Sequence, residues 1–452
     1  MTTVERKQKN LKFAKIMFLV VFLLAFFLFF NSLLNWQFLL LIAGFPILFW
    51  IFRNRLWILL VLALPGLLLG EVVNLSISND WVYEARISEV LLILAFLIFS
   101  IDAFLNQKIK DIKVDKIMVV LLAYLMLSIL SFYQIIDFRF FVAGLKIMGF
   151  SFMAYFLALN FLNSQTSIKW FFRSLIFTVF ALSIQVFIKF YQMGFSSKFF
   201  FERSFIEVPL GPIALVSAAL AFLLPLILSF YFKENEDYKE RAVSLVVFFL
   251  GSVAVFLSLG KAAIFSFALA LFYLFIKLKE KRIIFVLTGL AFTSLAFIFF
   301  TSFFTGLLER VEQTFVSENT QFRVTEYQVG WGIIQDNFIL GVGSGQQLYY
   351  YQDALNWDDP QLVNNYFLQS FIELGIVGLA VMVTALVIVY RRAREQIESG
   401  KGSGREVLVY GFVAGFIAVL LNGLAEVTIF AIPYAIIFWL VLGVFINLKK
   451  YA

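Results

Sequence analysis

The segment PLGPIALVSAALAFLLPLILSFYF, residues 209–232, contains no Asp, Glu, Lys or Arg. A run of about 20 apolar residues is long enough to cross the hydrocarbon core of a bilayer as a helix. Similar runs recur through the chain, in which 62% of the residues are hydrophobic and 14% are charged. The sequence therefore predicts an all-α, polytopic integral membrane protein with about 12–14 transmembrane helices.

The hydropathy pattern predicts fourteen spans and one long extracytoplasmic loop between the eleventh and the twelfth. The spans cover residues 14–31, 34–52, 56–74, 87–105, 117–134, 139–162, 168–192, 209–232, 242–259, 262–277, 283–303, 364–390, 406–422 and 427–448. Residues 1–303 are thus expected to form an N-terminal transmembrane bundle and residues 304–363 a large loop with short helices. Residues 364–452 are expected to form the C-terminal transmembrane helices.

The Lys and Arg residues set the expected orientation, because short cytoplasmic loops carry an excess of both. Basic residues cluster at the N-terminus and in alternate loops: Arg6, Lys7, Lys9, Lys12 and Lys15; Arg53 and Arg55; Lys108, Lys110, Lys113 and Lys116; Lys233, Lys239 and Arg241; Lys277, Lys279, Lys281 and Arg282; Arg391, Arg392, Arg394, Lys401 and Arg405; Lys449 and Lys450. All of them share one side of the membrane if both termini are cytoplasmic. The net charge of +7 is attributed to this topology rather than to nucleic acid, which is not an expected partner.

The composition excludes several kinds of active site. The chain contains no Cys and no His, which removes disulfides, thiolate nucleophiles, imidazole bases and most zinc sites. No soluble segment is large enough for a nucleotide-binding fold, and neither a P-loop nor a dinucleotide fingerprint is present. No cofactor and no metal are therefore expected.

Almost the only long part of the chain that is not strongly apolar includes residues 323–345, RVTEYQVGWGIIQDNFILGVGSG. A membrane protein that keeps one long polar loop usually places recognition or chemistry there. A short helix is expected at about 321–335 and a tight turn at Gly341, Gly343 and Gly345. The turn could offer backbone N–H groups to phosphate, but a plain turn is the favoured interpretation.

The order of motifs in this region resembles that of the bacterial O-antigen ligase and polymerase superfamily. In that family a periplasmic loop has an Arg, a Trp and a Gly-x-Gly turn, and a His-Asn-x-x-Leu-Gln-x-x-x-Glu-x-Gly segment opens the next span. Here the corresponding residues are Arg323, Trp331, the GVGSG turn at 341–345 and NNYFLQSFIELG at 364–375. Asn365, Leu368, Gln369, Glu373 and Gly375 match the last segment, whereas Asn364 stands at the His position.

Two further segments support the resemblance. In LSLGKAA, residues 257–263, Lys261 stands for the Arg that the family usually has at the outer start of this span. Arg203, followed by PIA at 212–214, corresponds to a family pattern of an Arg and then Pro-Asn, with the Asn missing here. The resemblance covers the second half of the chain, and the first half only by hydropathy.

The resemblance implies a bacterial inner-membrane enzyme that acts on glycans attached to undecaprenyl pyrophosphate at the outer face of the cytoplasmic membrane. Such enzymes move the glycan to an acceptor hydroxyl. The implied partners are the undecaprenyl-pyrophosphate-linked glycan, the lipid bilayer, and chain-length regulator or flippase proteins.

Basic residues on the predicted outer side are candidates for holding the pyrophosphate, because Lys and Arg can neutralise a leaving group without a metal. We expect Arg203, Lys261 and Arg323 to do so, with Arg139 and Lys146 as further candidates. The positive-inside rule disfavours Lys and Arg on the outer side of the membrane, so the presence of each of these residues there needs a separate explanation. A local ion pair or a snorkelling side chain is the alternative.

Asn365, Gln369 and Glu373 lie at i, i+4 and i+8, so they share one helix face. Glu373 is the first candidate general base, because ionisable groups inside a span are functional candidates by default. Asp358, Asp359 and Glu326 follow it. Two alternatives stay open: a polar face that bonds neighbouring helices, and an ion pair of Glu373 with Arg323 or Lys261.

The full set of candidate site residues then falls into two groups. The catalytic candidates are Glu373, Arg323, Asn364 and Asn365, and the substrate-binding candidates are Arg203, Lys261, Arg139, Lys146, Gln369 and Trp331. Trp331 could stack on a sugar face, although most aromatic residues near it fit the ordinary interfacial belt.

Three functions are compatible with these features. Polymerisation of O-antigen or other surface-polysaccharide repeat units is favoured, because a ligase would normally assign the missing His to the acceptor hydroxyl. Ligation of finished glycan to a lipid core or protein is the alternative. A flippase or transporter for lipid-linked sugars is a further alternative, which predicts two-fold internal repeats and broken helices near the midplane. No convincing repeat is present, and one dominant outer loop suits an enzyme better.

Overall fold

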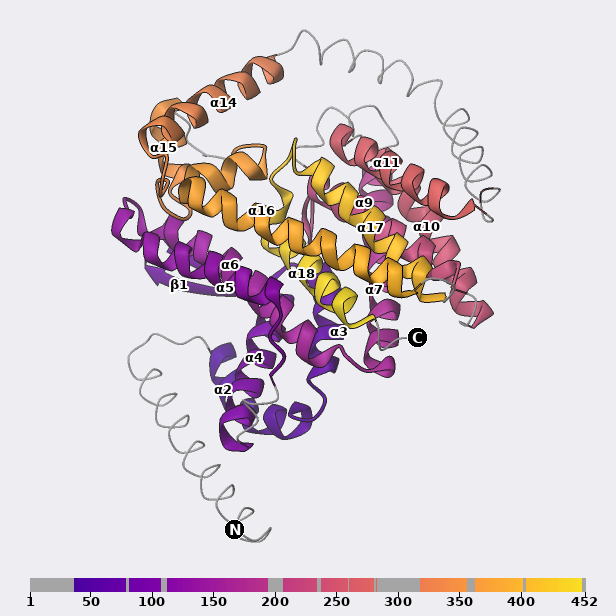
Figure 1. Cartoon of the computed structure of the whole chain (residues 1–452). Coiled ribbons are helices and arrows are strands. Elements are labelled where there is room, and N and C mark those ends of the chain that lie inside the picture. Colours follow the sequence, from indigo (N-terminus) through magenta and orange to yellow (C-terminus); the bar gives the residue numbers. More distant parts are fainter. Residues whose placement is uncertain are drawn as a thin grey trace. The chain divides into compact units, whose positions relative to one another are not determined.

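The protein is helical in nearly all the parts that its computed structural model describes (Figure 1). The described residues are 36–78, 81–106, 112–193, 206–233, 237–258, 260–279, 282, 318–355, 362–400 and 404–448. Within them, eight helices are long and apolar enough to cross a membrane. The predicted all-α, polytopic fold is confirmed. The predicted spans 14–31 and 283–303 lie outside the described residues.

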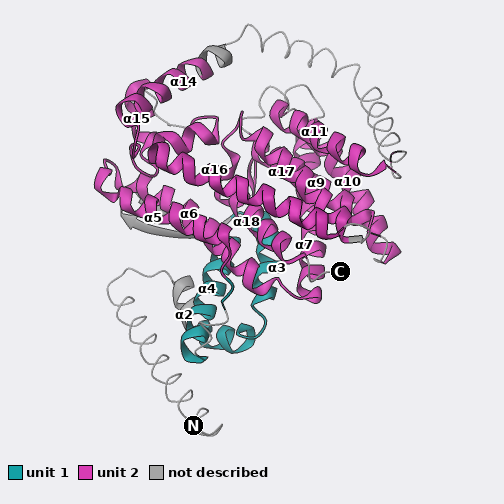
Figure 2. Ribbon diagram, in the orientation of Figure 1, with its two compact units in different colours: residues 1–113 teal, residues 114–452 magenta. Residues whose placement is uncertain are grey.

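The chain forms two compact units, residues 1–113 and 114–452 (Figure 2). Unit 1 contains α2 (Trp36–Phe52), α3 (Leu56–Gly66), a 3-10 turn (Leu67–Leu69), strands β1 (Glu71–Ser78) and β2 (Trp81–Arg86), and α4 (Ile87–Asn106). Within the described residues, α2 and α3 are separated by a 113° bend between Gly44–Phe52 and Leu56–Leu69, and together they are long and apolar enough for one broken span or a re-entrant loop.

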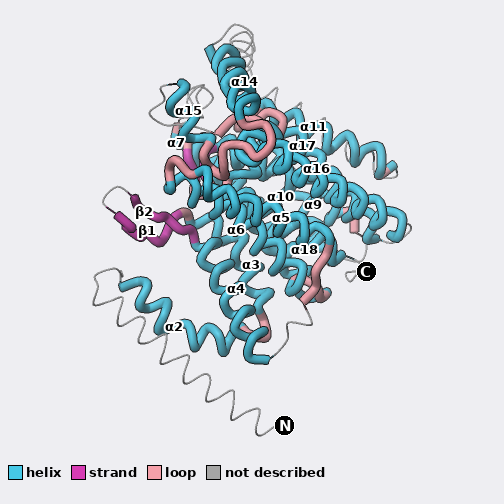
Figure 3. The backbone as a smooth tube through the Cα atoms, turned by 60° about the vertical axis from the view of Figure 1, so that its left-hand side comes forward, coloured by secondary structure: helices cyan, strands magenta, loops and turns pink. Residues whose placement is uncertain are grey.

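The third predicted span, 56–74, is shorter than expected because its last part is a strand. Helix α3 ends at Gly66, and Glu71–Ser78 pairs with Trp81–Arg86 as an antiparallel hairpin, with Glu71 opposite Arg86 (Figure 3). The apolar residues of EVVNLSIS extended the hydropathy signal past the helix. A short apolar run does not by itself distinguish strand from helix.

Unit 2 is built around one buried helix. Its elements are α5 (Lys116–Leu130), η3 (Ser131–Gln134), α6 (Phe138–Phe161), α7 (Gln165–Gln192), β3 (Glu207–Val208), β4 (Gly211–Pro212), α9 (Ile213–Tyr231), α10 (Tyr238–Leu257), α11 (Lys261–Lys277), α14 (Glu318–Asp336), α15 (Gln347–Leu355), α16 (Tyr366–Gly400), α17 (Gly404–Asn422), η6 (Thr428–Phe430) and α18 (Ile432–Asn447). In the apolar stretch of α9, 94% of the residues are buried, and the helix packs against α7, α10, α11, α17 and α18. It is therefore the core of the bundle rather than a lipid-facing span.

Small residues let the helices of unit 2 approach closely. Gly411 and Gly415 of α17 lie directly against Ser229 and Phe222 of α9, where a Cβ atom would meet side-chain and backbone atoms. Close approach at small residues is how membrane helices gain packing contacts without a hydrophobic driving force. The spacing of these two glycines thus fixes the contact between α9 and α17.

The helices of unit 2 run between two ends that differ in composition. At the basic end, Arg173 pairs with Glu240 at 2.5 Å and Lys277 lies 5.9 Å from the ring centre of Tyr410. Lys116 and Arg392 also lie at this end, at the start of α5 and in the last part of α16. At the loop end, α14, α15 and the loops beside them meet the start of α16 (Figure 3). This separation of basic residues from the polar loop agrees with a loop that faces outward, which stays a prediction.

Candidate functional site

The glycine-rich turn packs on a break in helix α16. Val342 N–H donates to Ile372 O at 2.9 Å and Gly343 N–H to Glu373 O at 2.8 Å. Helix α16 leaves helical geometry at Gly375, whose φ is 62°, and Ile376 N–H reaches Phe338 O at 2.9 Å. The turn therefore satisfies the carbonyl groups that the broken helix leaves open.

The same turn contacts the connection between α5 and α6. Ser344 N–H donates to Ser131 Oγ at 3.0 Å, and Gln134 Nε2 donates to Gly341 O at 2.8 Å. Gln346, fully buried, accepts from the Asp137 N–H at 2.9 Å and donates to Asp137 O at 2.8 Å. The amides at 342–344 are all used by protein acceptors, so the turn has a packing role and does not present them to phosphate.

Glu373 lies beneath this turn and is 5% exposed. Its carboxylate accepts hydrogen bonds from Gln369 Nε2 and from the Gly345 amide. Three residues before Glu373, Ser370 Oγ lies 2.9 Å from the Tyr124 hydroxyl of α5. Glu373 thus joins the loop to α16, and Ser370 joins α16 to α5. Among the described residues Glu373 forms no ion pair with Arg323 or Lys261.

Asn365 is the N-cap of α16. Its Oδ1 accepts from the N–H groups of Phe367 at 3.0 Å and Leu368 at 3.1 Å, and its Nδ2 donates to Leu424 O at 3.2 Å. An Asn in this position satisfies amides that a helix start leaves unpaired. The role of Asn365 in the fold is to begin α16 and to attach it to the turn that follows α17.

A second buried carboxylate, Glu326 on α14, meets Asn364. The exposed fraction of Glu326 is 0%. Its Oε1 accepts from the Asn364 N–H at 3.2 Å, and Asn364 Nδ2 lies 3.3 Å from Oε2. Tyr327 donates its hydroxyl to Asn364 O at 3.2 Å, and Tyr351 donates to Glu326 O at 2.7 Å. We call Arg323, Glu326, Asn364 and Glu426 the Glu326 cluster.

Burial raises the pKa of Glu326 above its ordinary value, and hydrogen bonds from Asn364 and the charge of Arg323 only partly oppose this. Removal from water disfavours the charged form, whereas donors and cations favour it. A carboxylate with a raised pKa is a stronger base than an ordinary carboxylate. Glu326 therefore has the environment that a general base needs.

Arg323 lies one helical turn before Glu326, on the same face of α14. Its Nη1 donates to Ala425 O at 3.1 Å, and its Nη2 forms an ion pair with Glu426 Oε1 at 3.4 Å. The Arg323 side chain is still 43% exposed. The guanidinium has five N–H donors, so these two contacts leave it able to bind an anion at the open side.

Lys261 is the first residue of α11, at the loop end of unit 2. Tyr273 of α11 contacts Tyr410 of α17, with ring centres 6.4 Å apart. The two helices are antiparallel in Figure 1, so the start of α11 lies beside the end of α17. Arg323 is attached to the residues that directly follow α17. Lys261 and Arg323 therefore flank the same end of one helix.

The other basic candidates differ in their surroundings. Arg139 is bound through two nitrogens to Asp137, with Nη2 2.7 Å from Oδ2. This contact lowers the pKa of Asp137 and is the local ion pair that the sequence left open as an alternative. Lys146 is half-buried two turns further along α6. Arg203 lies outside the described residues, as do Asp358 and Asp359.

Trp331, on α14, has an exposed fraction of 53%. It lies two turns after Arg323, and its ring is available to a ligand or to the membrane interface. The short loop helix predicted at 321–335 is confirmed as α14, Glu318–Asp336.

The structure brings together residues that the motifs did not rank highly. Glu326 stood behind Glu373 as a candidate base, and Glu426 had no place in any motif. Only the i, i+3 spacing of Arg323 and Glu326 could have pointed to the pair in the sequence. Glu426 could not have been found, because 102 residues separate Arg323 from the Ala425 carbonyl that it also binds.

Comparison with known proteins bears on the central part of this site. The family model described as O-Antigen ligase matches residues 246–383. This range contains Lys261, Arg323, Glu326, Trp331 and the segment 364–375. No curated protein matched the chain. The match to residues 246–383 confirms the predicted resemblance: this part of the chain is similar to the O-antigen ligase family.

Proposed function

We propose that the protein transfers a glycan from undecaprenyl pyrophosphate to an acceptor sugar hydroxyl at the outer face of the bacterial cytoplasmic membrane. The favoured reaction is polymerisation of surface-polysaccharide repeat units. The family match supports glycosyl transfer in general. The observation that carries the proposal is the Glu326 cluster, in which a partly exposed guanidinium lies one turn from a buried carboxylate held by Asn364.

In this reaction the bond between the sugar C1 and the pyrophosphate oxygen breaks, and a bond between C1 and the acceptor oxygen forms. Undecaprenyl pyrophosphate leaves with the electron pair, and the acceptor proton goes to a base. We assign Arg323 and Lys261 to the leaving pyrophosphate, because its negative charge grows as the bond breaks. Arg203, Arg139 and Lys146 are secondary candidates for the same anion.

We assign the base to Glu326 in place of Glu373. Removal of the hydroxyl proton requires a carboxylate within reach of the acceptor and a pKa near the working pH. Burial raises the pKa of Glu326, and Asn364 fixes both of its oxygens. Glu373 is committed to Gln369 and Gly345 beneath the loop, so we give Glu373 and Gln369 a supporting role.

The identity of Asn364 favours a polymerase over a ligase. Asn364 stands where the family has a His, and its amide hydrogen-bonds Glu326. An amide cannot exchange a proton with the acceptor, so its function is to orient the carboxylate. Transfer to a lipid core or protein remains the alternative reaction, and transport of lipid-linked sugars remains a further alternative.

Mass analysis of lipid-linked glycans in a deletion strain tests the proposal. Loss of a polymerase leaves single repeat units on the lipid carrier, and re-expression of the protein restores long chains. Accumulation of long chains on the carrier would establish a ligase instead. Accumulation of units accessible only from the cytoplasmic side would indicate a flippase and overturn the proposal.

A further inference from the structure

A groove follows the contact between α5 and α16. Two adjoining cavities of about 550 Å³ and 440 Å³ share Val119 and Val120 of α5 as lining residues. Their remaining walls are mainly apolar, with Ala123 on α5 and Ile376, Ala380 and Ile388 on α16. We call the two cavities together the α5–α16 groove. It belongs entirely to unit 2 and is separate from the Glu326 cluster.

The groove is long enough to take a lipid chain. Its walls on α16 extend from Ile376 to Arg392, which at 1.5 Å per helical residue is about 24 Å. The hydrocarbon core of a bilayer is about 30 Å thick. The lining therefore runs through most of the membrane depth, from the break at Gly375 to the basic end.

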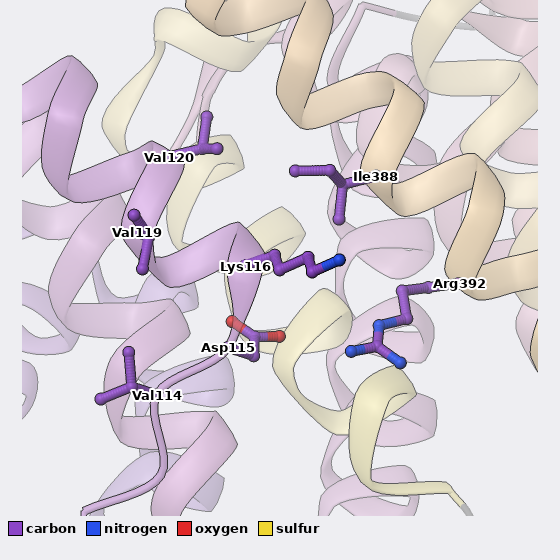
Figure 4. A pocket seen from close by; sticks show the side chains of 7 residues that line it. All are labelled: Val114, Asp115, Lys116, Val119, Val120, Ile388 and Arg392. Carbon is purple, nitrogen blue, oxygen red and sulfur yellow. The ribbon is translucent and has the colours of Figure 1, made fainter.

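Two cations mark the basic end of the groove. Figure 4 shows the Lys116 ammonium and the Arg392 guanidinium pointing into the same gap between the two helices. Arg392 also contacts Glu395 at 2.8 Å, in a pair whose two side chains are 37% and 56% exposed. An exposed pair of this kind contributes little energy and leaves most of the guanidinium donors open.

The nearby carboxylate is engaged elsewhere. Asp115 Oδ1 caps α5 by accepting from the Met118 N–H at 2.9 Å, and Oδ2 accepts from the Tyr155 hydroxyl at 2.6 Å. Among the described ion pairs none joins Asp115 to Lys116 or Arg392. Two like charges that face one gap repel each other, and an anion between them replaces this repulsion with two attractions.

We propose that the α5–α16 groove binds an anionic diacyl phospholipid of the leaflet at the basic end. Its phosphate lies between Lys116 and Arg392, and one acyl chain lies along Val119, Val120 and Ala123 toward Ile376. Basic pockets between transmembrane helices on the cytoplasmic side are known to suit anionic headgroups. The charge at one end and the apolar length above it match the two parts of this single ligand.

Native mass spectrometry of the full-length protein tests this proposal. The protein is released from nanodiscs that contain equal amounts of phosphatidylglycerol and phosphatidylcholine, and the retained lipid is counted. The wild-type protein should retain one phosphatidylglycerol in preference to phosphatidylcholine. Lys116→Gln and Arg392→Gln should each lower this retention about fivefold, as expected for ~1 kcal/mol per cation.

Matched variants separate this site from general surface effects. Arg394→Gln removes a cation on the same helix that is paired with Glu398 at 2.9 Å and does not line the groove, so retention should not change. Ala380→Phe narrows the groove and should displace the lipid, whereas Val383→Phe, at an exposed position of α16, should not. Size-exclusion profiles confirm that each variant is folded.

Three results would overturn the proposal. Equal retention of both lipids would show that the headgroup charge is not recognised. Equal retention by wild type, Lys116→Gln and Arg392→Gln would show that these cations do not hold the lipid. Retention by Ala380→Phe that is lost in excess inorganic phosphate would show an anion site without an acyl chain.

Discussion

Two buried carboxylates lie at the loop end of unit 2, and they differ in their neighbours. Glu373 is held by an amide side chain and a backbone amide beneath the glycine-rich turn, where it joins the loop to α16. Glu326 is held by Asn364 one turn from the partly exposed Arg323. Burial and a place near the motifs are thus common to both carboxylates, whereas a nearby partly exposed cation distinguishes Glu326.

The largest expected effect separates the two carboxylates directly. Glu326→Gln keeps the shape and one oxygen that can accept from Asn364, although its amide nitrogen cannot accept as Oε2 does. It cannot take the acceptor proton, so glycan transfer should fall about a hundred- to ten-thousandfold. Glu373→Gln keeps the shape and one acceptor oxygen beneath the turn and should keep most of its activity. Transfer from a lipid-linked donor in proteoliposomes measures both. An inactive Glu373→Gln beside an active Glu326→Gln would reverse the assignment.

The next effect concerns the cations. Arg323→Ala and Lys261→Ala should each slow transfer about a hundredfold, or ~3 kcal/mol in the barrier, because each removes a charge that stabilises the departing pyrophosphate. Arg323→Lys should recover part of the rate, since a point charge replaces a fork of donors.

Glu426→Gln is the matched control for Arg323→Ala, because it removes the ion pair and keeps the guanidinium. It should stay active in the same proteoliposome assay. If Glu426→Gln is as slow as Arg323→Ala, Arg323 acts through its ion pair and not through the substrate.

The glycine-rich turn provides the third prediction, on stability. Gly345 has a φ of 74°, and an added Cβ would meet the Phe140 carbonyl. Gly345→Ala should therefore destabilise the protein by about 1–3 kcal/mol from the backbone conformation alone, and further through the clash. Gly332→Ala, in α14 with nothing near the added Cβ, should be stabilising by roughly 0.5–1 kcal/mol. Thermal unfolding in detergent measures both, and equal effects would show that the turn does not bear on the helix break.

A smaller effect follows from the raised pKa of Glu326. The folded protein holds this proton more tightly than the unfolded chain, so stability is lost as pH rises from the unfolded pKa through the folded one. Glu326→Gln removes the penalty and should unfold at a higher temperature than wild type at neutral pH, although it is inactive. The rate of the wild type should fall as pH drops through the raised pKa. A Glu326→Gln variant that is less stable at neutral pH would show that the charge is compensated.

The smallest expected effect is that of a chelator. Arg323 and Lys261 replace a metal at the pyrophosphate in this mechanism, so EDTA should leave the transfer rate unchanged. Loss of activity in EDTA that a specific divalent ion restores would require a metal held by oxygen ligands near the Glu326 cluster.

The sequence predicted the helical membrane fold, the helix α14, and the resemblance to the O-antigen ligase family. Hydropathy sufficed for the fold because a bilayer core has no water, so each span must satisfy its own backbone as a helix. It failed at residues 71–78, where a paired strand continues the apolar signal of α3. The bend between α2 and α3 could not be predicted from the sequence either. Two apolar runs joined by residues Arg53 to Arg55 have the same hydropathy pattern whether the chain reverses fully or bends by 113°.

Motif order placed Arg323, Asn364, Asn365 and Glu373 in one region, because those residues are close in the chain and share a loop and a helix start. Their roles depended on partners that are distant in sequence. Asn365 was attached to the turn after α17 through Leu424, Arg323 was attached through Ala425 and Glu426, and the glycine turn closed on α6. The sequence by itself determined that the described part of the chain is a bundle of long apolar helices and which polar residues lie in the segment between them. Only the tertiary structure decided which carboxylate faces a cation and which one holds the helix break, because burial and hydrogen-bond partners arise from contacts across the fold.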